Sequence, residues 1–283
     1  MYRLLIEPRD LRAPALIMAF DAWVDSGAAA TGAANHVARG GETIASFDTD
    51  ALLDYRARRP ILDVVDGQAK SLAWQELDVK LVRADARDLL VLTGPEPDYR
   101  WREFASSVLE LALRVGAVES VVLGAVPAAV PHTRSVSLLT TASPSSLLGP
   151  DDRVPEGLLR VPAAALSVVQ MHVAEHGIPT IGFFAQVPHY VTSTYTPGVL
   201  ALVERLARHL GVGFPLGDLV EQAQQQRAQL DAIVAERPEV KSYVEQLESI
   251  NPPTGLGERL PSGDEIAAEV ERFLRGTGGE PGE

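Results

Sequence analysis

The sequence predicts an α/β protein, built as a three-layer α/β/α sandwich around a mostly parallel sheet. Short apolar runs such as residues 181–184 are typical of strands that are buried on both faces. Amphipathic segments such as residues 101–115 alternate with these runs, as expected where helices cross over between parallel strands. The chain has 283 residues, of which 46% are hydrophobic, so it can bury a sizeable core.

The first half of the chain alternates strands with helices. The predicted strands are 14–20, 42–47, 88–93 and 120–123, and the predicted helices are 28–39 and 101–115. Within residues 61–83, apolar stretches flank Asp66-Gly67, a dipeptide that strongly predicts a hairpin turn, so we expect an antiparallel pair at the sheet edge. The charged segment 48–60 is interpreted as solvated surface.

The second half continues the same pattern and then changes. We expect a strand at 136–141, a loop at 142–156, a helix at 163–176, the buried strand at 181–184 and a helix at 197–210. Beyond the core domain, 1–215, residues 216–283 are predicted to form a helical hairpin (217–236 and 239–249), a short last helix (263–275) and a disordered tail. Residues 217–283 hold 14 acidic and 6 basic residues, so most of the acidity lies in this appendage.

Composition excludes several classes of protein. A net charge of −13 argues against nucleic acid and against an anionic membrane as the main partner. The absence of cysteine excludes disulfides, thiolate metal sites and a cysteine nucleophile. No stretch approaches the ~18 apolar residues of a membrane span, and charged residues interrupt the first 20 positions, so we expect a cytoplasmic protein.

Familiar catalytic and cofactor-binding motifs are mostly missing. The chain has no phosphate loop ending in Gly-Lys-Ser/Thr, no Gly-x-Gly-x-x-Gly after a strand and no Gly-x-Ser-x-Gly elbow, so we expect no cofactor. One match remains: His172, Glu175 and His176 satisfy His-x-x-Glu-His, a zinc-peptidase pattern. Because histidines near a helix end also favour the helix dipole, we prefer a structural role to a metal site.

Polar residues follow three of the predicted strands. This candidate binding cluster consists of Asp21, Trp23, Asp25, His132, Arg134, Gln186, His189 and Tyr190. The carboxylates could bind a cation, Arg134 an anion, and a histidine could act as a base. Helix capping by the carboxylates and rigid turns at the histidines explain the same residues, and no nucleophile–base pair is recognisable, so we favour a structural role over catalysis.

Several of these segments together resemble the proteasome assembly chaperone 2 family, in its bacterial branch. The segments are residues 20–27, 47–50 with 54–60, 92–98, 123–127 with 130–134, 182–190 and 260–269. The resemblance implies a phosphorylase/hydrolase-like α/β/α fold, self-association, and a non-enzymatic role through protein contacts, with 20S proteasome subunits among the partners. The chain lacks the hydrophobic-Tyr-X ending with which relatives dock on the proteasome. The alternative is a protein or enzyme that binds a nucleoside, nucleotide or phosphate through the strand-end loops.

Overall fold

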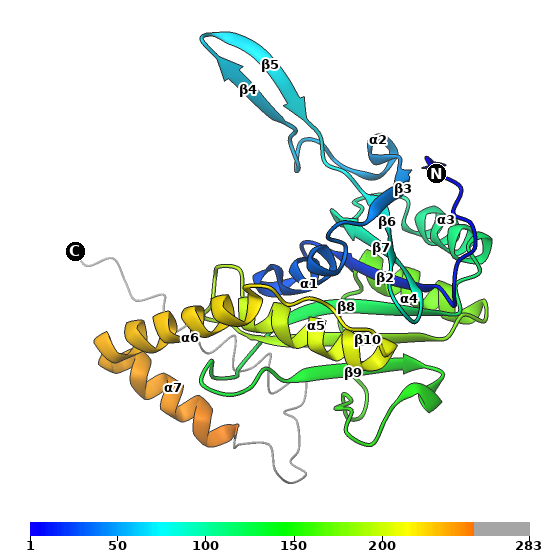
Figure 1. Cartoon of the computed structure of the whole chain (residues 1–283). Coiled ribbons are helices and arrows are strands. Elements are labelled where there is room, and N and C mark those ends of the chain that lie inside the picture. Colours follow the sequence, from blue (N-terminus) through cyan, green and yellow to red (C-terminus); the bar gives the residue numbers. More distant parts are fainter. Residues whose placement is uncertain (252–283) are drawn as a thin grey trace.

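An eight-stranded mixed sheet forms the centre of the computed structural model, which describes residues 1–251 (Figure 1). Its strand order is β1-β3-β6-β7-β2-β8-β10-β9. The strands are β1 (Tyr2–Leu4), β2 (Ala15–Phe20), β3 (Glu42–Phe47), β6 (Asp78–Arg83), β7 (Asp88–Gly94), β8 (Glu119–Ala128), β9 (Leu138–Ser143) and β10 (Thr180–Pro188). The four central strands, β7, β2, β8 and β10, run parallel, and antiparallel strands flank them on both sides.

Helices cover both faces of this sheet, which confirms the predicted three-layer α/β/α arrangement. The helices are α1 (Ala29–Val37), α2 (Thr49–Leu52), α3 (Trp101–Arg114), α4 (Ala165–Glu175), α5 (Thr196–Leu210), α6 (Leu219–Glu236) and α7 (Pro238–Ile250), with 3-10 turns at Ser26–Ala28 and Ser145–Leu147. One hydrophobic core joins α1 and α5 to the sheet, and a second joins α3 and α4 to its other face. Successive residues of β2 alternate between the two cores, as a strand buried on both faces requires.

Two central strands extend further than their apolar runs predict. β8 and β10 pair in parallel from Ser120 and Thr180 to Ala128 and Pro188. Gln186 was expected in a strand-end loop, but it lies inside β10, is buried, and donates its backbone N–H to the Ser137 carbonyl at 2.9 Å. The prediction ended the strand at the first polar side chain. The hydrogen-bonded pairing of β10 with β8 continues past Gln186, because one polar residue does not interrupt the pairing of two long neighbouring strands.

The Asp66-Gly67 hairpin is present, but not at the edge of the main sheet. β4 (Ile61–Val65) and β5 (Gln68–Ala73) form a separate two-stranded sheet that extends away from the body of the protein (Figure 1). Both turn residues have positive φ angles, 51° and 75°, as the tight turn requires. The placement at the edge was wrong, since β4 and β5 pair only with each other and every residue in them is exposed.

The two helices predicted after the core are present as α6 and α7. Helix α6 packs against α5, and α7 packs against α6. The predicted helix at 263–275 and the predicted tail lie outside the described residues. Within residues 1–251, no helix combines the length and hydropathy that crossing a membrane requires.

Candidate functional site

Asp21 follows β2 directly and joins two neighbouring loops. Its Oδ2 accepts a hydrogen bond from Arg58 Nη1 at 2.7 Å, and its Oδ1 accepts the backbone N–H of Glu96 at 3.0 Å. Glu96 in turn accepts the backbone N–H of Ala165, the first residue of α4, at 2.7 Å. Asp21 therefore ties the segment after α2 to the loop after β7.

Asp25 is buried and satisfies the start of α1. Its Oδ1 accepts the backbone N–H groups of Ala30 (2.7 Å) and Thr31 (3.2 Å), and its Oδ2 accepts the Thr31 hydroxyl. Burial raises the pKa of the Asp25 carboxyl, while the Thr31 hydrogen bonds oppose that shift. Trp23, two residues earlier, is 60% exposed. Of the two carboxylates predicted to cap a helix, Asp21 and Asp25, only Asp25 has the geometry of a helix cap.

His132 lies in the loop after β8 and is paired with Tyr190. The backbone N–H of His132 donates to the Tyr190 hydroxyl at 2.8 Å, and the same hydroxyl lies 2.7 Å from His132 Nδ1. Because the hydroxyl already accepts one N–H, its own proton is assigned to Nδ1, which leaves the ring proton on Nε2. That nitrogen lies 3.3 Å from Asp231 Oδ1 on α6.

His189, one residue past β10, is held through both ring nitrogens, by groups on β8 and α7. Its Nδ1 lies 3.2 Å from the Ala128 carbonyl, which can only accept, so Nδ1 carries the ring proton and Nε2 accepts from the Tyr243 hydroxyl at 3.1 Å. The His189 ring also lies edge-on to Tyr190 and to Tyr243, with centroid separations of 5.6 and 5.7 Å. His189 thus connects β8 to α7.

The α6–α7 hairpin covers this loop with further polar contacts. Arg227 of α6 donates to the Thr133 carbonyl, and the Thr133 hydroxyl donates to Glu248 of α7. Asn251, at the end of α7, donates to the Ala129 carbonyl at 2.9 Å. We call the loop residues and their partners on α6 and α7 the covered cluster: His132, Thr133, His189, Tyr190, Arg227, Asp231, Tyr243, Glu248 and Asn251.

The chemistry of the covered cluster favours a structural role. Burial lowers the pKa of His132, which keeps the imidazole neutral, and burial raises the pKa of Tyr190 well above its ordinary value, which keeps the phenol protonated. His132 Nδ1 and both ring nitrogens of His189 are hydrogen-bonded to protein groups, and His132 Nε2 is fully buried 3.3 Å from Asp231, without hydrogen-bond geometry among the described residues. A general base needs a nitrogen that can reach substrate, and neither ring offers one here.

Arg134 has no partner on its buried nitrogen in the part of the chain that the structure describes. The residue is half-buried, and its Nε is fully buried without a hydrogen bond among residues 1–251. No hydrogen bond, ion pair or ring contact among the described residues joins Asp21 to the covered cluster. The eight predicted residues are therefore distributed over separate groups with different partners.

His172, Glu175 and His176 lie at the end of α4. The two rings are 4.4 Å apart, but His176 Nδ1 lies 2.8 Å from the His172 carbonyl, and Glu175 and His176 are exposed. The His176 ring thus satisfies a carbonyl of the last helical turn. Across residues 1–251, no three His, Cys, Asp or Glu side chains are grouped so that they could hold a metal ion.

Comparison with known proteins assigns the family. The sequence profile of the PAC2 family matches residues 19–234, from the end of β2 through most of α6. The chain belongs to the PAC2 family. No curated protein matches it.

Several solved structures share the fold. Rv2714 from Mycobacterium tuberculosis, described as a protein of unknown function, is 32% identical over 97% of this chain and 92% of its own, with a TM-score of 0.82. Rv2125, described as a proteasome-assembly chaperone homologue from the same organism, is 31% identical over 81% of this chain and 99% of its own, with a TM-score of 0.75. PbaB from Pyrococcus furiosus, described as an archaeal proteasome activator, shares the fold at 16% identity, covers 82% of this chain and 98% of its own, and has a TM-score of 0.64.

Sequence reasoning missed the partners that this PAC2 protein uses around its predicted residues. Arg227, Asp231 and Glu248 lie on polar helices, where charged residues are expected to face water. Tyr243 lies within the predicted helix 239–249, and an aromatic residue with a polar tip on such a polar helix is the one signal that could have indicated a docked surface. Arg58 was interpreted as part of a solvated segment.

Proposed function

We propose that this PAC2 protein is a non-enzymatic cytoplasmic protein that acts through protein–protein contacts, with second copies of itself and 20S proteasome subunits as partners. In this proposal residues 1–215 are the core domain and residues 216–283 are an appendage, of which α6 and α7 contact the strand-end loops. The observation that carries the proposal is the exposed apolar face of the β4–β5 hairpin.

The hairpin has two unequal faces. Strand pairing places Leu62 opposite Leu72 and Val64 opposite Ala69, so these four apolar side chains share one face, interrupted by a register shift at Lys70. Leu62, Leu72 and Val64 are 54%, 46% and 57% exposed. The other face carries the Ser71 hydroxyl, which donates to Asp63 at 2.5 Å, together with Ile61 and Val65.

An isolated two-stranded sheet is marginally stable in water and needs a third layer or a further strand. The apolar face of the hairpin supplies the surface for such a layer, and its extension away from the body leaves room for a second molecule (Figure 1). A second copy can offer the same face, since closed homo-oligomers are built from repeated use of one surface. Self-association is therefore the first contact we assign to the hairpin.

The double variant Leu62→Thr/Leu72→Thr is expected to shift the protein from oligomer to monomer, because it removes a facing apolar pair and leaves the hairpin backbone intact. Sedimentation velocity at micromolar concentration measures the change. Ile61→Thr, on the opposite face, is the matched control and should leave the oligomer unchanged. A monomeric unmodified protein, or equal effects of both variants, would contradict the assignment.

Proteasome partnership is supported by Rv2125, the 31% identical relative described as a proteasome-assembly chaperone homologue. In a bacterial host that has a 20S proteasome, the full-length chain is expected to co-purify with α or β subunits, and its deletion is expected to slow their assembly. The Ile61→Thr variant is a control for the effect of a hairpin substitution and should co-purify with the subunits as the unmodified chain does. If α and β subunits are not enriched and proteasome assembly is unchanged on deletion, the proteasome partnership is ruled out. The self-association proposal would not be affected.

Binding of a nucleoside, nucleotide or phosphate is the second candidate function. The unpartnered Nε of Arg134 favours it, since a buried guanidinium nitrogen near strand ends can hold an anion. Separation of Asp21 from the covered cluster counts against a shared catalytic site. A thermal shift with phosphate or a nucleotide that disappears in Arg134→Gln would favour binding over the contact role.

A further inference from the structure

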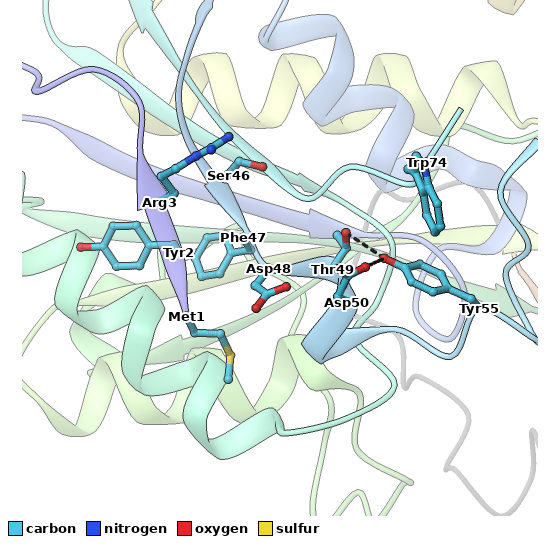
Figure 2. Close-up of a pocket in the computed structure, with 10 residues that line it drawn as sticks. All are labelled: Met1, Tyr2, Arg3, Ser46, Phe47, Asp48, Thr49, Asp50, Tyr55 and Trp74. Carbon is cyan, nitrogen blue, oxygen red and sulfur yellow. Dashed lines mark hydrogen bonds between the residues drawn. The ribbon is translucent and has the colours of Figure 1, made fainter. Parts of the chain in front are cut away.

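A cavity lies at the base of the hairpin, beside the β1–β3 edge of the sheet. Its volume is about 780 Å³. Figure 2 shows the side chains around it, which come from the start of β1, the end of β3, α2, the segment after α2 and the residue after β5. None of the eight predicted site residues lines this cavity.

Two aromatic rings form one wall of the cavity. The rings of Tyr55 and Trp74 meet edge-on, with centroids 4.9 Å apart and an interplanar angle of 66°. Tyr55 is fixed by its hydroxyl, which donates to Asp50 Oδ1 at 2.6 Å, whereas Trp74 is 49% exposed. The Tyr55 ring is thus held at its tip, and the half-exposed Trp74 ring gives a ligand aromatic surface beside it.

Two carboxylates also line the cavity: Asp50 lies beside the Tyr55 ring, and Asp48 lies further along, next to Phe47 (Figure 2). The pKa of the Tyr55 phenol is raised first by burial, then by the hydrogen bond to Asp50 and the charges of both carboxylates. The two carboxylates therefore give the side of the cavity near Tyr55 a negative potential. Arg3 also lines the cavity and is the opposing charge, and no ion pair among the described residues engages its side chain.

We propose that this cavity binds a guanidinium group, from a free cation or from an arginine side chain of a polypeptide. A guanidinium is planar and stacks on Trp and Tyr rings, and its N–H fork matches a carboxylate. It keeps its charge at every physiological pH, so the aromatic wall and Asp48 and Asp50 act on it together. An anion would meet the two carboxylates and a neutral ligand would leave them unused.

Acetyl-arginine methylamide is the probe, and acetyl-citrulline methylamide is its uncharged counterpart of nearly the same shape. Calorimetry and tryptophan fluorescence of the full-length protein should show saturable binding of the arginine probe and no saturation with the citrulline probe. Trp23→Phe, at an exposed tryptophan outside the cavity, is the matched control and should leave the affinity unchanged. Equal binding of both probes would overturn the proposal.

Three variants test the cavity itself, with circular dichroism to confirm that each is folded. Trp74→Ala and Asp50→Asn should each weaken the arginine probe by about two- to fivefold, the size expected for exposed cation–π and carboxylate contacts. Arg3→Met should tighten binding, because it removes a like charge. Weaker binding of the arginine probe by Arg3→Met would show that Arg3 supports the bound probe instead of repelling it, and would overturn the proposal.

The source of the guanidinium is resolved by a third probe, acetyl-Gly-Arg-Gly methylamide. Tighter binding of the tripeptide than of the single residue supports a polypeptide ligand. Equal binding supports a free cation, and both outcomes keep the guanidinium site. These measurements do not depend on the hairpin contacts, so failure here leaves the proposed function untouched.

Discussion

Replacing Gly94 by alanine is expected to destabilise the fold by about 3–5 kcal/mol, the largest single effect we predict. A Cβ atom at Gly94, the last residue of β7, would lie 2.4 Å from the Glu76 carbonyl oxygen and 3.0 Å from Leu77 Cα. Both are backbone atoms and cannot swing aside. The φ angle of +153° adds strain for any residue with a side chain.

Chemical denaturation measures this loss, and Gly40→Ala is the matched control. Gly40 also has a positive φ, +73°, but an added Cβ meets nothing within 4 Å. Its cost should be about 1 kcal/mol, which reflects backbone conformation alone. A Gly94→Ala loss no greater than that of Gly40→Ala would show that the chain entering β6 can move away from β7, against the expectation.

Gly94 also illustrates which parts of the fold the sequence could predict. The apolar run of β7, residues 89–92, identifies a buried strand, because a strand buried on both faces is mostly apolar. The approach of Glu76 to the end of that strand depends on pairing between β6 and β7, which joins Asp78 to Thr93. Local periodicity carries no information about such a contact, so the strand was predictable and the special role of its glycine was not.

The strand-end loops show the same limit at the candidate site. His132, His189 and Tyr190 were selected because polar residues next to buried strands are unusual, and the structure brings these three together. Their grouping follows from the adjacency of β8 and β10, whose ends share one edge of the sheet. Asp231 and the other partners on α6 and α7 could not be predicted, because the docking of a polar helix depends on tertiary geometry.

The guanidinium cavity was missed for a related reason. Segment 48–60 was interpreted as solvated surface because it is rich in charge, and charged loops usually are solvated. The structure places Tyr55 of this segment against Trp74, 19 residues further along the chain and beyond the hairpin. An aromatic pair formed across an inserted hairpin leaves no periodic trace in the sequence.

Tyr190→Phe is expected to cost about 2–4 kcal/mol, the second large effect. Removing this hydroxyl deprives two groups of His132, the backbone N–H and Nδ1, of their partner in a buried setting. Each unsatisfied buried group costs about 1–3 kcal/mol. Since the His132 ring also faces Asp231, the loss should loosen α6 and α7 before the sheet itself.

Hydrogen exchange resolves this order, with faster exchange expected across residues 219–250 than in β2 and β7. Tyr2→Phe is the matched control, because the Tyr2 hydroxyl donates to Glu110 at 3.2 Å in an exposed position. Its loss should cost about 0.5 kcal/mol or less, since water replaces the partner. Equal effects of the two variants would show that the covered cluster contributes little to stability.

The same cluster should make stability depend on pH. The pKa of folded His132 is lowered, first by burial, below the ordinary value of 6.5, and the nearby Asp231 opposes the shift while Arg227 adds to it. The unfolded chain therefore binds the proton more readily, so the contribution of His132 is complete above pH 6.5 and declines as pH falls toward the folded pKa. Urea midpoints should consequently fall more steeply between pH 7.5 and pH 5 for the unmodified protein than for His132→Gln, whose amide does not titrate. If the urea midpoints of the two proteins fall in parallel with pH, Asp231 raises the pKa of His132 by as much as burial lowers it, which would contradict the expectation.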